Sequence, residues 1–230
     1  MATLHDIQKR ITSVTATHQI TSTMEMISRT KIKRAKRRVD RAELYAREMR
    51  KLLTVLSDPN GEPVALATPH DSVRKVVLVV ITSDRGLAGQ FNNNILQLAQ
   101  RTLKKYEQRE CQVEIIACGK VGINYFTYRG YKPVIAFRDL SGDPRPEEAD
   151  TIADYLVDAY LSGTIDEVYA FYNHSKNLYE QVPAMWKIMP INMNMFFEQR
   201  MAGNAQGIAD QDPQLKQLQG YINYEPSREA

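Results

Sequence analysis

The sequence has few of the residues that hold metal ions or stabilise small secreted proteins. It contains only two cysteines, Cys111 and Cys118, and neither lies at metal-ligand spacing from a histidine or a second cysteine pair. We therefore expect two buried free thiols, a reducing compartment and no metal or other cofactor. The sequence also lacks an apolar segment of signal-peptide length near residue 1 and any run of about 18 apolar residues, which predicts a chain that is soluble or at most peripheral to a membrane.

The common phosphate-binding motifs are missing as well. The stretch "SDRGLAGQFNNNI", Ser83–Ile95, follows a run of β-branched residues and opens a helical pattern, which is where a glycine-rich loop would hold phosphate. However, Gly89 is followed by Gln90 and Phe91 rather than by Lys and Ser or Thr, and the loop has two glycines where a dinucleotide fingerprint has three. We expect a tight turn whose glycines adopt unusual dihedrals and whose last residue caps the next helix, with small-molecule binding as the less favoured alternative. Its structural residues would be Asp84, Gly86, Gly89 and Asn92.

No catalytic constellation replaces these motifs. The four histidines have no nucleophile beside them, there is no HExxH segment, and the carboxylates do not pair in a recognisable acid/base arrangement. We expect no catalytic residues. From the residues alone the sequence favours a rigid adaptor with a projecting helix, and a nucleotide-binding enzyme is the second hypothesis.

The N-terminal part predicts one long helix without a partner. Between Leu4 and Leu56 there is neither proline nor glycine, and a helix of this extent would be about 80 Å long. Two sets of positions repeat every seven residues, as in a coiled-coil seam. One set is Leu4, Ile11, His18, Glu25, Ile32, Val39, Ala46 and Leu53, and the other is Ile7, Val14, Thr21, Ser28, Ala35, Ala42, Met49 and Leu56. The rest of the sequence offers no matching second pattern, so the companion helix would come from another chain or from a segment outside these 230 residues.

Two features of this helix leave alternatives open. The seam weakens between His18 and Ser28, which indicates either a local imperfection or a surface that slides against changing partners. Residues 29–51 carry eleven Lys and Arg against three acidic residues, about +8, whereas the whole chain has a net charge of +3. This basic run is typical of a solvated helix face. Phosphate binding is less favoured because no aromatic residues interleave Arg29–Arg41, and we expect no nucleic-acid partner.

The middle of the chain predicts an α/β domain. Strands are expected at residues 73–82, 113–119, 131–137, 166–173 and 184–191, and helices at residues 92–108, 120–130 and 146–161. Such alternation predicts a three-layer, Rossmann-like α/β fold with a mostly parallel sheet covered on both faces. The predicted organisation is a shaft helix at residues 1–57, a linker at 58–72, an α/β foot domain at 73–195 and a C-terminal segment at 196–230.

Several segments in order resemble one family, the gamma subunit of rotary F-type ATP synthases. The stretch "IQKRITSVTATHQITSTMEMISRTKIKRA" is similar to that family's first shaft helix, and "TSDRGLAGQFNNNI" is similar to the loop after its first strand. Further similar segments are "GKVGINYF", "DEVYAFYNHSKNLYEQVP", "IMP" and "YEPS". The chain departs from the family at Ala88, Gln90 and His174, where Cys, a small residue and Phe are common, and the regulatory cysteine pair of chloroplast members is not recognisable.

The resemblance implies a non-catalytic rotor that couples proton-driven rotation of the membrane c-ring to ATP synthesis or hydrolysis in the alpha/beta hexamer. The implied partners are the alpha, beta and epsilon subunits and the c-ring, at the cytoplasmic face of a bacterial plasma membrane. The implied hexamer interface is Met24, Met26, Ile27, Lys31, Lys33, Arg34 and Lys36, and the implied interface with epsilon and the c-ring is Tyr221, Tyr224 and Glu225.

In that family a second long helix follows the "YEPS" motif, whereas this sequence stops at Ala230. That helix would be the missing companion of the heptad seam. We therefore expect that this sequence is a truncated chain, a proteolysed product or a shortened gene product.

Overall fold

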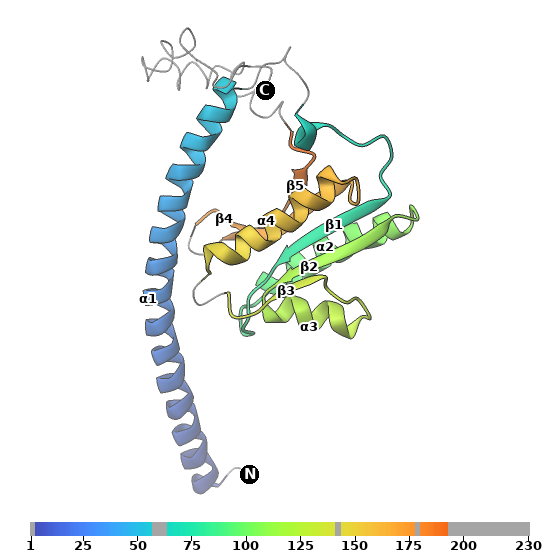
Figure 1. Cartoon of the computed structure of the whole chain (residues 1–230). Helices are drawn as coiled ribbons and strands as arrows, with labels where there is room; N and C mark the ends of the chain where they lie inside the picture. Colours follow the sequence, from blue (N-terminus) through green and yellow to red (C-terminus); the bar gives the residue numbers. More distant parts are fainter. Residues whose placement is uncertain (1–2, 57–63, 141–143, 178–179, 193–230) are drawn as a thin grey trace. The chain divides into compact units, whose positions relative to one another are not determined.

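A computed structural model of the chain describes residues 3–56, 64–140, 144–177 and 180–192. The chain divides into two compact units, one that contains the N-terminal helix and one that spans Asp58–Gln199. Figure 1 shows the helix and the α/β unit.

The first unit contains a single helix of 53 residues, α1 (Leu4–Leu56). Thr3 caps its N-terminus: the Asp6 backbone N–H donates to Thr3 Oγ1 at 3.3 Å, and the Thr3 N–H donates to the Asp6 carboxylate at 3.0 Å. Every side chain of α1 that the structure describes, residues 4–49 and Leu52, is exposed. The predicted long helix is confirmed.

The second unit is built on a five-stranded sheet with strand order β3-β2-β1-β4-β5. Its strands are β1 (Lys75–Ile81), β2 (Gln112–Cys118), β3 (Ile135–Phe137), β4 (Glu167–Ser175) and β5 (Gln181–Met189). Strands β1 to β4 are parallel, and β5 pairs antiparallel with β4. The short connection between β4 and β5 accounts for this difference, since a parallel pairing needs a long crossover. The predicted mostly parallel sheet is confirmed.

Helices cover both faces of the sheet, as the alternating pattern predicted (Figure 1). They are α2 (Phe91–Glu107), α3 (Lys120–Tyr128) and α4 (Pro146–Leu161), and a 3-10 turn, η1 (Ala65–Ala67), precedes β1. Alternate residues of β1 separate two cores: Leu78 packs with residues of α2 and α3, whereas Val77 packs with residues of α4. The unit therefore buries two apolar cores of its own, one on each face of the sheet.

Two strands are shorter than the sequence predicts: β1 by its end residues, and β3 by more than half. The expected strand at residues 131–137 pairs only from Ile135, because the preceding residues close the end of α3. Gly130 donates its N–H to Thr127 O, and Tyr131 donates its N–H to Phe126 O, at 3.1 and 3.0 Å. Pro133 has no N–H to add to a ladder. The residues just after α3, which β-propensity alone would assign to the strand, thus belong to the turn that ends the helix.

Candidate functional site

The glycine-containing loop after β1 lies at the carboxyl edge of the parallel strands, where open α/β sheets bind ligands. Asp84 occupies the anion position of this edge. Its Oδ1 accepts the backbone N–H of Lys120, the first residue of α3, and that of Asp139, after β3, both at 2.9 Å. A carboxylate at a helix N-terminus satisfies free amides and matches the positive end of the helix dipole. Asp84 therefore satisfies amides at the start of α3 and after β3 with a carboxylate of the chain itself.

The next amides of α3 are also used by the chain itself. Val121 donates its N–H to Ser83 O at 3.2 Å, and Gly122 donates its N–H to Thr82 Oγ1 at 2.9 Å. The approach is close enough that a Cβ at Gly119 would lie 2.3 Å from Thr82 O, and Gly119 has a φ of +100°. The first turn of α3 is thus packed onto the end of β1 with its donors occupied, which is an arrangement for rigidity rather than for phosphate binding.

Asn92 does not cap α2, contrary to the sequence-based prediction. The helix begins at Phe91, and Gln90 is its N-cap residue. Asn92 is instead buried, and its Oδ1 accepts the Ser83 N–H at 2.9 Å while its Nδ2 donates to Ser83 Oγ at 2.8 Å. A cap at Asn92 requires a helix that begins at residue 93, but α2 begins two residues earlier. Asn92 therefore lies within the helix, and its side chain holds the loop from there.

The prediction that both glycines of the loop adopt unusual dihedrals is right for one of the two. Gly89 has a φ of +54°, in the left-handed region, but the other residue of this loop in that region is Leu87, with φ +58°, and not Gly86. The Leu87 side chain is 96% exposed. Beside the loop, Asn173 of β4 donates its Nδ2 to the carbonyl oxygen of Phe91, the first residue of α2, at 2.9 Å. The point where strand order reverses is therefore bridged by the protein's own polar groups.

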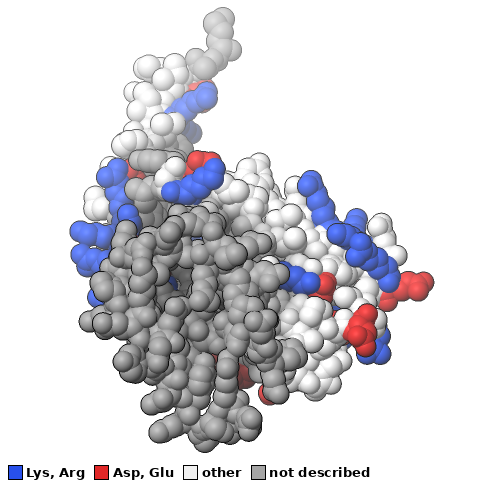
Figure 2. Space-filling model, turned by 90° about the horizontal axis from the view of Figure 1, so that it is seen from above, with Lys and Arg blue, Asp and Glu red and all other residues white. Residues whose placement is uncertain are grey.

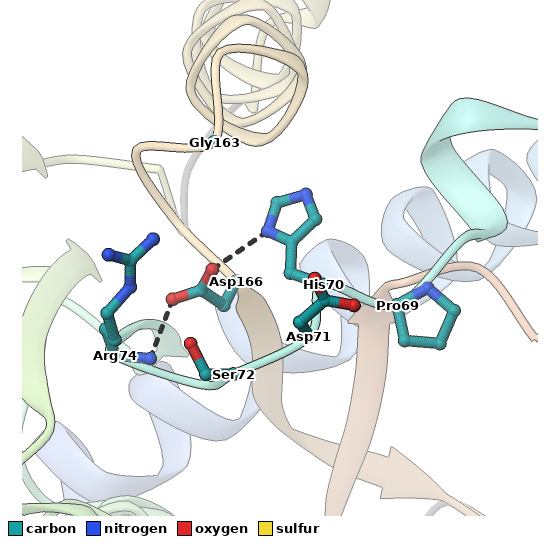
Figure 3. Close-up of a pocket in the computed structure, with 7 residues that line it drawn as sticks. All are labelled: Pro69, His70, Asp71, Ser72, Arg74, Gly163 and Asp166. Carbon is teal, nitrogen blue, oxygen red and sulfur yellow. Dashed lines mark hydrogen bonds and ion pairs between the residues drawn. The ribbon is translucent and has the colours of Figure 1, made fainter.

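A pocket lies at the opposite, amino edge of the sheet (Figure 3). It has a volume of about 470 Å³ and is lined by Pro69, His70, Asp71, Ser72, Arg74, Gly163 and Asp166. Its walls are polar and carry both signs of charge, and the Asp166 carboxylate already accepts hydrogen bonds from three groups. Small-molecule sites are mostly apolar with a few free polar groups, so this pocket does not have the character of a nucleotide site. In the described ranges no cluster of three metal-ligating side chains occurs.

The predicted hexamer interface lies on α1, and all seven of its residues are exposed. Met24, Met26 and Ile27 are 49%, 69% and 53% exposed. Lys31, Lys33, Arg34 and Lys36 follow within three turns. Figure 2 shows Lys and Arg side chains at several places on the face of the molecule that it displays. The predicted foot residues Tyr221, Tyr224 and Glu225 lie outside the described residues.

The cysteines are both free thiols, of which Cys118 is buried and Cys111 is half-buried. Burial raises the pKa of the Cys118 thiol to about 11. None of the helices in the described segments is long and apolar enough to span a bilayer.

The sequence matches characterised relatives along its length. A family model described as ATP synthase matches residues 3–230. The ATP synthase gamma chain of Syntrophobacter fumaroxidans is 34% identical over 193 residues, and the match covers 83% of this chain and 66% of that one. That of Chloroherpeton thalassium is 34% identical over 234 residues, covering 100% of this chain and 75% of that one. The chain belongs to the ATP synthase gamma-chain family.

Solved structures show the same fold at lower identity. The gamma-chain fold seen here matches the central stalk of the Tetrahymena thermophila mitochondrial ATP synthase with a TM-score of 0.52 and 22% identity, covering 74% of this chain and 72% of that one. A chain of the Euglena gracilis mitochondrial ATP synthase matches with a TM-score of 0.51 and 17% identity, covering 84% of this chain and 58% of that one.

Membership in the gamma-chain family confirms the resemblance that the sequence motifs predicted, including that the chain is a non-catalytic subunit. The chain spans from 66% to 75% of the length of the two relatives described above.

Proposed function

We propose that this chain is the central rotor of an F-type ATP synthase, which couples rotation of a membrane c-ring to ATP synthesis or hydrolysis in an alpha/beta hexamer. The observation that carries the proposal is α1, a helix of 53 residues whose described side chains are all exposed. Seam residues such as Ile11, Val14 and Val39 are 61%, 61% and 60% exposed. A helix with such a stripe is stable in water only when other helices or subunits cover it.

The charge on α1 supports a partner surface of opposite sign. Arg29, Lys33, Arg37 and Arg41 recur at intervals of four residues, and like charges at this spacing repel each other by about 0.2–0.5 kcal/mol per pair. Within the helix Glu25 offsets only the first of them, through a contact of 2.8 Å to Arg29. We infer that Lys31, Lys33, Arg34 and Lys36 meet acidic segments of the hexamer.

The hydroxyl groups of α1 support a surface that turns. Thr17 donates its hydroxyl to Ser13 O, Thr21 donates to Thr17 O, and Thr23 donates to Gln19 O, each at 2.9 Å. Because the hydroxyl donors bond to the helix's own carbonyls, the outward part of each side chain is its methyl group. A surface of methyl groups forms few directional bonds with the subunits around it, so its interaction energy with them varies little with the angle of rotation. We infer that residues near Met24, Met26 and Ile27 slide against the hexamer in this way.

The α/β unit would be the foot of the rotor. In this proposal residues 1–57 are a shaft, 58–72 a linker, 73–195 the foot, and 196–230 a C-terminal segment. Tyr221, Tyr224 and Glu225 would face epsilon and the c-ring. The solved relatives include a central stalk with a c-ring, and an assembly of F1 with OSCP and c-ring. We place the complex at the cytoplasmic face of a bacterial plasma membrane, with this chain attached peripherally.

Charge reversal on α1 tests the proposal. We expect Lys31→Glu and Arg34→Glu to weaken association with the alpha/beta hexamer about tenfold or more, because each brings a like charge against an acidic partner. Lys105→Glu, an equally exposed charge reversal on α2, is the matched control and should leave hexamer binding unchanged. The measurement is co-purification with the hexamer, followed by ATP-driven proton pumping in vesicles.

Two results would contradict the rotor proposal. One is normal binding and pumping in both α1 variants, which would remove the basic face from the hexamer interface. The other is a saturable rise in the melting temperature of the isolated chain on addition of ATP or NAD, which a nucleotide-binding protein would show and a rotor would not.

A further inference from the structure

The segment from Val64 to Arg74, here called the strap, leads from the α1 side of the chain into β1. It carries η1 and enters β1 at Lys75. Backbone contacts attach its first half to the α/β unit: Ile191 donates its N–H to Leu66 O at 2.8 Å. The Tyr160 hydroxyl, from α4, donates to Thr68 O at 2.7 Å. The strap is thus a bound segment rather than a loose connection.

Asp166 fastens the second half of the strap. This residue directly precedes β4, and its side chain is 3% exposed. Its Oδ2 accepts the backbone N–H groups of Arg74 and Lys75 at 2.8 and 2.9 Å. Burial disfavours the charge, but these two amides and His70 outweigh it, and the pKa of Asp166 lies below its ordinary value. An ionised carboxylate therefore ties the entry of β1 to the start of β4.

His70 occupies the remaining oxygen of that carboxylate. Its Nδ1 lies 2.8 Å from Asp166 Oδ1, and Figure 3 shows the ring turned toward the carboxylate. The same ring stacks on Tyr160, with centroids 4.5 Å apart and planes 21° from parallel. His70 therefore joins the strap to α4 by a ring stack and to the start of β4 by a hydrogen bond.

We propose that His70 is a positioning residue for rotor coupling: through Asp166 and Tyr160 it locks the strap to the α/β unit, so that the chain leading from the foot to the shaft does not peel away under load. This inference rests on the proposed rotor function. It follows from the path of the chain, because any pull on the strap from the α1 side reaches His70 before it reaches β1. A hydrogen bond to a carboxylate resists such opening more strongly than a neutral one.

Two substitutions separate the hydrogen bond from the ring stack. His70→Phe keeps an aromatic ring for Tyr160 and loses the donor, whereas His70→Asn keeps a donor near the position of Nδ1 and loses the ring. Both are compared with the unchanged chain in the assembled enzyme in vesicles. The first readout is protons pumped per ATP hydrolysed, and the second is hydrogen exchange at the Arg74 and Lys75 amides.

We expect His70→Phe to exchange these two amides about tenfold faster and to pump about half as many protons per ATP hydrolysed, with hydrolysis itself retained. His70→Asn should restore both readouts toward those of the unchanged chain. A lowered pumping ratio in His70→Phe, with both readouts restored in His70→Asn, is a result that a purely structural role would not produce.

The inference is overturned if His70→Phe accelerates exchange but pumps normally, since the strap would then open without affecting coupling. It is also overturned if His70→Asn behaves like His70→Phe, because the hydrogen bond would not be the fastening. The unchanged chain is assayed before any variant. If it fails to enter the enzyme or to support pumping, the rotor proposal itself is overturned. If His70→Phe does not fold, Asp166→Asn serves as the second variant: it removes the carboxylate that His70 and the Arg74 and Lys75 amides bind, and it should also speed exchange of these amides and lower the pumping ratio.

Discussion

The helix α1 exposes its described apolar side chains, whereas the α/β unit buries apolar side chains in cores of its own. In the α/β unit β1 has five successive buried residues, Val76–Val80, and both of their faces are covered by helices of the same unit. In α1 every described side chain is exposed, including the apolar heptad positions. One unit is complete with respect to its own core, whereas the other is a surface prepared for partners. A rotor needs both, since the foot must hold its shape while the shaft changes its neighbours.

The largest expected effect separates the two units by stability. Phe171 of β4 is fully buried in the core under α2 and α3, so Phe171→Ala should lower the free energy of unfolding by about 3–5 kcal/mol. Val39 of α1 is 60% exposed, so Val39→Ala should change it by less than about 0.5 kcal/mol in the isolated chain. Urea unfolding of the full chain, followed by the fluorescence of its single tryptophan, measures both.

Similar losses in the two variants would break the comparison, since α1 would then share the cooperative core of the α/β unit. Within the assembled enzyme the expectation for Val39→Ala changes, because a partner that covers the seam would make the same truncation costly.

A smaller effect depends on pH and belongs to the α/β unit alone. The native pKa of Asp166 is lowered, so its ionised form stabilises the fold at pH values above its unfolded pKa of about 3.9. This stabilisation is lost as the pH falls through the native pKa. Asp166→Asn should therefore cost about 1–2 kcal/mol at pH 7, and the difference from the unchanged chain should shrink below about pH 4. Melting curves of both chains at a series of pH values provide the measurement, and a difference that does not vary with pH would argue against ionised Asp166 as the fastening.

Much of this contrast could be predicted from the sequence. The absence of proline and glycine from Leu4 to Leu56 predicted the bounds of α1, and helix α4 begins and ends where the pattern placed it, at Pro146 and Leu161. These signals are local, because helix propensity and periodicity lie in neighbouring residues. The family followed from motifs in the same order as in its other members.

The contacts that hold the loops could not be predicted in this way. Asp84 was expected to be a turn residue, but its partners at Lys120 and Asp139 lie 36 and 55 residues away. His70 had no motif around it, and its partner Asp166 is 96 residues distant. Asn92 fitted a cap by type and position, yet the helix begins at Phe91 and turns Asn92 toward Ser83. The partners of Asp84 and His70 are set by strand order, which one sequence does not reveal, whereas the partner of Asn92 depends on the residue at which α2 begins.

The smallest expected effect sharpens the view of α1 as a methyl-bearing surface. Thr21→Val keeps the shape and the outward methyl group of Thr21, and removes only a hydroxyl that donates to Thr17 O at 2.9 Å inside the helix. In the rotor proposal this change should leave ATP hydrolysis and proton pumping within about 20% of the unchanged enzyme, because the lost donor never faced the hexamer and an exposed substitution of this kind changes stability by less than about 0.5 kcal/mol. Thr21→Gln, which projects an amide from the same position, is the matched comparison and should slow rotation-limited turnover, since the amide can form directional bonds with the subunits around it. If Thr21→Val were the more damaging of the two, the hydroxyl itself would be the contact, and α1 would meet its partners through specific hydrogen bonds rather than through a smooth surface.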